Sequence, residues 1–217
     1  MNKSSIIKQT AEHVRKVMQG ESSGHDWWHA YRVWKMATHI GKKEKADMFI
    51  VELAALLHDI ADYKLHDGDE EIGPKTATKW LESLGVDEKV IQHICQIMRD
   101  ASFKGANVRT QMKTIEGEIV QDADRLDAIG AIGIARTFAY GGHKGSEIYD
   151  PNVKPIMYNS FEEYKSNTPP TISHFYEKLL LLKNLMNTKT AKSLAEGRHK
   201  YMENFLKKFY KEWEGKE

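Results

Sequence analysis

The most apolar run of the chain, MFIVELAALLHDIA at residues 48–61, ends close to an adjacent histidine and aspartate, His58 and Asp59. The run is too short and too often interrupted by polar residues to span a bilayer, so it predicts a helix buried in a protein core. Burial of an unpaired carboxylate is costly, whereas a metal ion neutralises it and also takes an imidazole nitrogen as ligand. The alternative is a His-Asp pair exposed to water at the helix end.

Helical signals flank this run. Asp47 is placed to cap the helix that follows it. Gly73-Pro74 opens another helix, which Gly85 ends. Asp87-Glu88 suits the start of a helix over residues 87–99. Helices therefore account for the middle of the chain.

The C-terminal half continues this pattern. A segment over about 112–140 is predicted to end at Gly141-Gly142, and residues 141–160 have the composition of a long irregular loop able to cover a small substrate. Beyond Pro169-Pro170, apolar residues at helical spacing predict a packed helical pair over about 170–213. The expected apolar stripes are Phe175, Leu179 and Leu182 on the first helix, and Leu194, Tyr201, Phe205 and Phe209 on the second.

Composition limits the class of protein. No strand pattern, repeat or low-complexity linker interrupts residues 1–217, so we predict a single all-α domain. The 32 basic and 31 acidic residues leave a formal charge of +1, which argues against a nucleic-acid partner. The N-terminus carries no signal segment and Cys95 is the single cysteine, so we expect a cytoplasmic protein with no membrane partner. The oligomeric state is left open.

The stretch GHDWWHAYRV, residues 24–33, gathers two histidines, an aspartate and two tryptophans. His25 and His29 are four residues apart, so one face of a helix can present both rings. The structural alternative is that His25 caps the helix or packs against Trp28.

A third polar group lies in EIVQDADRLDAIGAIGIAR, residues 118–136, where three aspartates interrupt an apolar segment. If the segment is helical, Asp124 and Asp127 share one face, whereas Asp122 is rotated by roughly 200° from Asp124. Only one or two of these carboxylates can reach a common site.

The ordered set His29, His58-Asp59 and Asp124 resembles the HD-domain superfamily of metal-dependent phosphohydrolases. The likeness covers nearly the whole chain, including QDADRLDAIGAIGIAR and LAEGRH. In these stretches the chain is similar to a bacterial branch of stand-alone HD hydrolases, some of them implicated in nucleotide hydrolysis. The resemblance implies a helical bundle of the HD type, with the HD core over about 20–140.

The resemblance also implies a ligand set. His29, His58, Asp59 and Asp124 match the four metal-ligand positions, and Asp124 is preferred over Asp122 because the family pattern places the ligand directly before the arginine of ADR. His25 and Asp26 would then orient His29 or face the substrate, while the tryptophans pack into the core.

Two imidazoles and two carboxylates suit one divalent transition metal, with Mn expected first and Fe, Co, Ni or Zn as alternatives. Its open positions can hold a water and a phosphate oxygen, which makes hydrolysis of a small phosphorylated substrate the natural reaction. The resemblance implies that this substrate is a nucleotide. Many relatives read His-Ser-Phe where this chain has Ala101-Ser102-Phe103, which favours one metal ion over two. His93 and His143 are weaker candidates for an extra ligand.

Basic and acidic residues near the ligands are candidates for substrate binding and proton transfer. Arg32, Lys64 and Arg125 are the expected phosphate contacts, although a surface charge or a structural ion pair explains each one equally well. Asp62 and Asp127, together with Lys64, are the candidate catalytic residues. Further basic residues on the C-terminal helices are Lys178 and Arg198.

Two other classes of function stay open. A cyclic-nucleotide phosphodiesterase of the same superfamily would use two metal ions and more histidines. A non-catalytic nucleotide-binding module would have no chemical reason to keep two histidines beside two aspartates. The sequence leaves open which nucleotide is bound and whether orthophosphate or pyrophosphate is released.

Overall fold

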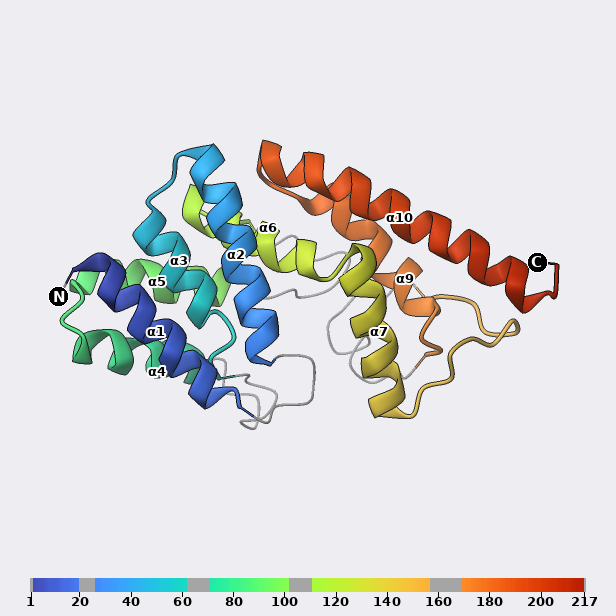
Figure 1. The fold of residues 1–217 in the computed structure, drawn as a ribbon, viewed down its shortest axis with the longest axis horizontal. Helices are drawn as coiled ribbons and strands as arrows, with labels where there is room; N and C mark the ends of the chain where they lie inside the picture. The colour runs from blue at the N-terminus through green and yellow to red at the C-terminus, as the bar shows by residue number, and fades with distance from the viewer. Residues whose placement is uncertain (1, 20–25, 62–70, 102–110, 157–168, 217) are drawn as a thin grey trace. The chain divides into compact units, whose positions relative to one another are not determined.

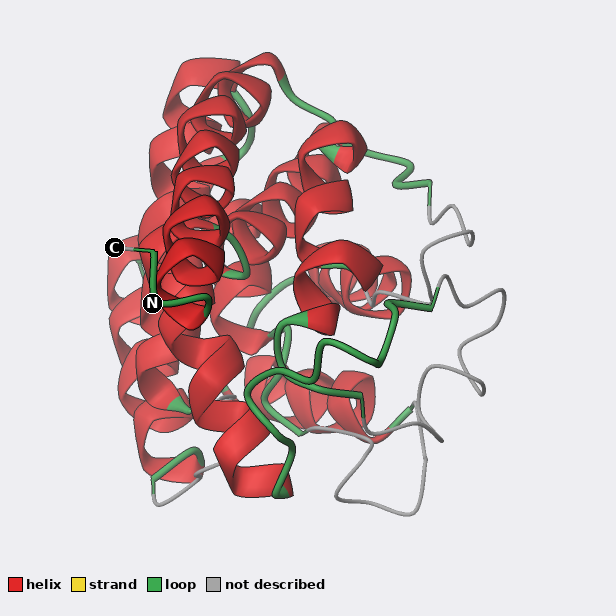
Figure 2. Ribbon diagram, turned by 90° about the vertical axis from the view of Figure 1, so that its right-hand side faces the viewer, coloured by secondary structure: helices red, strands yellow, loops and turns green. Residues whose placement is uncertain are grey.

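The computed structural model describes residues 2–19, 26–61, 71–101, 111–156 and 169–216. Within these ranges the regular elements are helices and no strand occurs, which confirms the all-α prediction (Figure 2). None of the helices described here combines the length and the apolar character needed to cross a membrane. The chain divides into two compact units, Met1–Phe103 with Thr110–Ala123 and Lys104–Arg109 with Asp124–Glu217. Helix α6 (Ile115–Asp127) begins in the first unit and ends in the second.

The first unit is built around the apolar helix that opened the sequence. Its other helices are α1 (Lys3–Val17), α2 (Trp27–Glu44), α4 (Ile72–Ser83) and α5 (Glu88–Ala101). Helix α3 (Met48–Leu57) contacts α1, α2 and α5, and α4 contacts α5 (Figure 1). Val51 and residues 53–57 are fully buried, so α3 is the central core helix that its sequence predicts.

The local helix signals act as expected in this unit. The Asp47 carboxylate accepts a hydrogen bond of 2.9 Å from the Phe49 main-chain N–H and so caps α3. Asp87 accepts a bond of the same length from the Lys89 N–H, just before α5. Gly85 ends the turn after α4 with φ = +69°, a conformation that favours glycine.

The second unit contains α7 (Gly130–Lys144), α9 (Ser173–Glu177), the 3-10 helix η2 (Leu179–Leu185) and α10 (Lys189–Trp213). Helix α10 contacts both α7 and η2, and η2 contacts α9 (Figure 1). A packed C-terminal pair is therefore present, but its first member is a short α-helix followed by a 3-10 helix.

Two predicted boundaries were wrong. The segment over 112–140 is two helices rather than one, because the chain turns after Asp127 and Gly130 adopts φ = +78°. Helix α7 then continues through Gly141-Gly142 to Lys144. Gly141 is needed there for packing, since a Cβ atom would lie 2.2 Å from Oγ1 of Thr171. The predicted loop thus starts at Gly145, and its residues 157–160 lie outside the described part of the chain.

The apolar stripe on the last helix also differs from the prediction. Phe175, Leu179 and Leu182 are buried as expected. On α10, however, the buried positions are Ala191, Ala195, Met202 and Leu206, and Tyr201 is 55% exposed. Phe205 is half-buried beside this stripe, and its ring contacts those of Phe138 and Phe175.

Candidate metal centre

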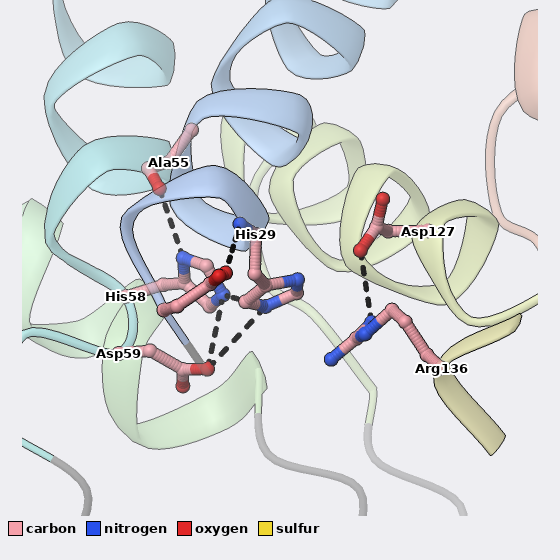
Figure 3. A network of polar contacts seen from close by, with 7 residues as sticks. His29, Ala55, His58, Asp59, Asp127 and Arg136 are labelled. Carbon is pink, nitrogen blue, oxygen red and sulfur yellow. Dashed lines mark hydrogen bonds and ion pairs between the residues drawn. The ribbon is translucent and has the colours of Figure 1, made fainter. Parts of the chain in front are cut away.

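Three side chains of the first unit converge at the end of α3 (Figure 3). The Nε2 atoms of His29, on α2, and His58, the C-cap of α3, are 3.2 Å apart. Both lie close to Oδ2 of Asp59, at 3.4 Å from His29 and 3.5 Å from His58. In the described part of the chain, these three residues form a group whose ligand atoms all lie within 4.8 Å of one another. The structure thus brings three of the four predicted ligands together.

The donor set fits a single metal ion. Ligand atoms about 2.1 Å from one ion, at bond angles of about 90–110°, lie about 3.0–3.4 Å from one another. The separations of 3.2 to 3.5 Å between the two imidazole nitrogens and the carboxylate oxygen are close to that range. Two nitrogens and one oxygen are ligands suited to a divalent transition metal.

A main-chain carbonyl fixes the tautomer of His58. Nδ1 of His58 lies 2.8 Å from the carbonyl oxygen of Ala55, which can only accept a hydrogen bond. Nδ1 therefore carries the proton, and Nε2 presents its lone pair toward His29 and Asp59 (Figure 3). The side chains of His29 and His58 are 0% and 5% exposed, whereas that of Asp59 is 26% exposed. Solvent thus reaches the cluster on the Asp59 side.

Asp26 holds the first turn of the helix that carries His29. Its carboxylate is the N-cap of α2 and accepts a 2.9 Å hydrogen bond from the main-chain N–H of His29 itself. The expectation that both tryptophans wall the helix into the core was wrong, because Trp28 is 57% exposed and Trp27 is half-buried. His25 lies outside the described residues.

The aspartates of α6 have different surroundings. Asp122 is fully buried, whereas Asp124 is half-buried, as expected for residues on different sides of one helix. Asp124 belongs to the second unit, and its role as the fourth ligand stays a prediction from the sequence. The neighbouring Arg125 is buried and donates a hydrogen bond from Nη1 to the main-chain carbonyl of Leu185.

Asp127, a candidate acid or base, has a well-defined partner within the second unit. Its Oδ2 atom accepts a 2.8 Å bond from Nη1 of Arg136 on α7, and Asp127 is only 5% exposed (Figure 3). This ion pair holds the carboxylate in one orientation.

The remaining candidates are dispersed or fall outside the described part of the chain. Asp62 and Lys64 belong to the residues that the structure does not describe, and Arg32 is half-buried on α2. His93 contacts Oγ1 of Thr114 at 2.9 Å, and His143 is exposed. Neither of these two histidines belongs to the group around His29.

Two supporting groups were not found from the sequence. The Ala55 carbonyl could have been inferred, because His58 follows it by three residues at a helix end where the last carbonyls lack helical partners. Arg136 gives no such signal, since a turn between two helices separates it from Asp127.

The fold and this cluster define a helical protein with a candidate metal site, and comparison with known proteins gives its family. The family model described as HD domain matches residues 27–129, and the chain belongs to the HD-domain superfamily. The crystal structure of an HD-superfamily hydrolase from Bacillus thuringiensis is similar, with 46% identity, a TM-score of 0.78 and coverage of 98% of this chain and 99% of that one.

A second relative is YpgQ of Bacillus subtilis, named an uncharacterized protein. It is 41% identical over 203 residues, which cover 93% of this chain and 91% of YpgQ. A crystal structure of YpgQ in complex with ADP aligns with a TM-score of 0.75 and 35% identity over the structural alignment, covering 98% of this chain and 97% of that one.

Proposed function

We propose that this protein is a metal-dependent phosphohydrolase that cleaves a phosphoester or phosphoanhydride bond of a nucleotide. The observation that carries the proposal is the convergence of two imidazole nitrogens and one carboxylate oxygen within 3.5 Å of one another. Membership of the HD-domain superfamily supports hydrolysis, and the ADP complex of YpgQ supports a nucleotide as the ligand.

His29, His58 and Asp59, with Asp124 as the proposed fourth ligand, would hold one divalent ion, for which we propose Mn. When bound, such an ion would neutralise charge on the phosphoryl group and lower the pKa of a water molecule. The chain itself supplies orientation. The Ala55 carbonyl holds the His58 ring, and the Asp26 carboxylate holds the turn on which His29 stands.

Charged residues near the ligands would act on the substrate. Lys64 and Arg32 are proposed to bind phosphate oxygens, with Arg125 as a further candidate, because each is close in sequence to a ligand. Asp62 and Asp127 are proposed to move a proton to or from the reacting groups. The ion pair with Arg136 keeps the Asp127 carboxylate fixed.

The test is a panel of nucleoside mono-, di- and triphosphates and cyclic nucleotides. Metal-stripped protein is assayed with Mn, Fe, Co, Ni, Zn and Mg in turn, and the phosphate product is identified. His58→Ala is the control, since it removes a direct ligand and is expected to abolish both metal binding and turnover.

The outcomes separate the three functions. Hydrolysis of a nucleotide with one bound ion per chain supports the proposal. Cleavage of cyclic nucleotides with two ions per chain would identify a phosphodiesterase instead. Nucleotide binding without turnover under any metal would leave a non-catalytic binding module.

A further inference from the structure

Arg198 reaches from α10 to the C-terminal end of α6, within the second unit. Its Nη1 atom donates a hydrogen bond to the main-chain carbonyl of Leu126. Leu126 lies in the last turn of α6, where main-chain carbonyls lack the N–H donors that they find in the helix interior and the helix dipole attracts a cation. The Ile129 N–H also reaches this carbonyl, at 3.3 Å, so Arg198 adds a charged donor to a weak main-chain bond.

The turn between α6 and α7 is shaped to admit the Arg198 side chain. A Cβ atom at Gly130 would lie 3.0 Å from Cγ and 3.1 Å from Cβ of Arg198. Gly130 also adopts φ = +78°, which disfavours other residues. The two distances show that the stem of Arg198 packs directly on the turn.

The charges around this turn come from several elements of the second unit. Asp127, at the end of α6, pairs with Arg136 of α7 at 2.8 Å. Burial lowers the pKa of the half-buried Arg198, whereas the charge of the Asp127 carboxylate acts to raise it. These two groups therefore interact electrostatically. Arg125 donates to the Leu185 carbonyl in η2.

Asp124 stands on the same last turn, two residues before Leu126, and its own carbonyl accepts a 3.2 Å bond from the Ala128 N–H. A shift of the helix end would therefore shift the Asp124 carboxylate. We infer that Arg198 is a positioning residue, which fixes the Asp124 carboxylate for metal binding by holding the last turn of α6 through the Leu126 carbonyl. This inference rests on the proposed function, because it takes Asp124 as the fourth ligand.

The test measures Mn²⁺ affinity of the metal-stripped chain of residues 1–217 by calorimetric titration, independently of turnover. Arg198→Met removes the donor but keeps an apolar stem over Gly130. The matched control is Lys192→Met, since Lys192 also lies on α10 and donates to a main-chain carbonyl, that of Asn187, at 3.0 Å. Asp124→Ala and the double variant Asp124→Ala/Arg198→Met complete a cycle.

Loss of a group that orients a ligand typically weakens metal binding by about 10–100-fold, and we expect Arg198→Met to fall in that range. Lys192→Met should bind Mn²⁺ as the wild type does. The double variant should bind no more weakly than Asp124→Ala alone, because Arg198 then has no ligand left to position. Arg198→Lys should recover part of the affinity, since an ammonium can donate to the carbonyl. Arg198→Lys also provides the measurement if Arg198→Met does not fold.

Unchanged Mn²⁺ affinity in Arg198→Met and Arg198→Lys, or a full additional loss in the double variant, would overturn the inference. Normal affinity in Asp124→Ala would reject Asp124 as a ligand and the inference with it. Weak binding in Asp124→Ala beside normal binding in Arg198→Met would reject the inference alone. Metal-binding results as expected, without any nucleotide turnover, would reject the proposed function but keep the role of Arg198.

Discussion

Replacing Asp59 by alanine should abolish the thermal stabilisation that a bound metal ion gives to this protein. Asp59 supplies the only carboxylate among the three converging donors, and without it two imidazoles remain. At about 100 times the dissociation constant, an ion that binds only the native state stabilises it by about 2.7 kcal/mol. Each kcal/mol raises the Tm of a chain of this size by about 2–4 °C, so the wild type should gain about 5–11 °C.

The metal-free variant should remain folded. The Asp59 side chain is 26% exposed and contacts the two imidazoles at 3.4 and 3.5 Å, so its contribution to the metal-free fold is at most about 1 kcal/mol. The assay is thermal unfolding followed by circular dichroism, with and without excess Mn²⁺, and Glu82→Ala on the surface of α4 is the control. A full Mn²⁺-dependent shift in Asp59→Ala would show that Asp59 is not a ligand.

Four further predictions concern single residues. Asp26→Ala should lower the free energy of unfolding in urea by about 0.5–2 kcal/mol, because it removes the N-cap of α2, whereas Asp26→Asn should retain most of it. Asp124→Ala should weaken Mn²⁺ binding far more than Asp122→Ala, and the opposite order would mean that the ligand was misassigned. Lys64→Ala should keep its metal but lose kcat/KM, and unchanged kinetics would make Lys64 a surface charge. Burial raises the pKa of Glu177 in the folded state, so its contribution to stability should be complete at low pH. The contribution should fall as pH rises from the ordinary carboxyl pKa of the unfolded chain through the raised pKa of the folded protein. Glu177→Gln should flatten this pH dependence of the free energy of unfolding, measured by urea denaturation across pH.

The helices of the first unit follow from local sequence because local forces decide them. Asp47 and Asp87 cap main-chain N–H groups two residues away, and Gly85 adopts its positive φ within one turn. Such contacts depend on neighbours in sequence rather than on the rest of the fold. The apolar helix α3 is likewise buried because nearly every one of its residues is apolar.

The boundaries in the second unit depend on contacts between distant residues and were missed for that reason. The glycine at position 141 predicts a helix end, yet α7 continues through it. A glycine is needed there because Thr171 packs where the side chain of another residue would lie. The stripe on α10 is set by Ala191 and Ala195, whose small side chains permit close packing, while Tyr201 remains exposed. Hydrophobicity alone therefore predicted more burial for the aromatic residues of α10 than the structure shows.

The sequence by itself determined the helical class, the HD-type family and the residues proposed as ligands, because ligand chemistry depends on residue type and order. Only the tertiary structure brought Nε2 of His29 and Oδ2 of Asp59 to within 3.4 Å, and only it showed that the Ala55 carbonyl sets the His58 tautomer. The contact of Arg198 with the Leu126 carbonyl likewise joins residues 72 positions apart. Such pairings arise from helix packing, which brings together residues that lie far apart in the sequence. Packing of this kind produces no periodic pattern from which the pairs could be predicted.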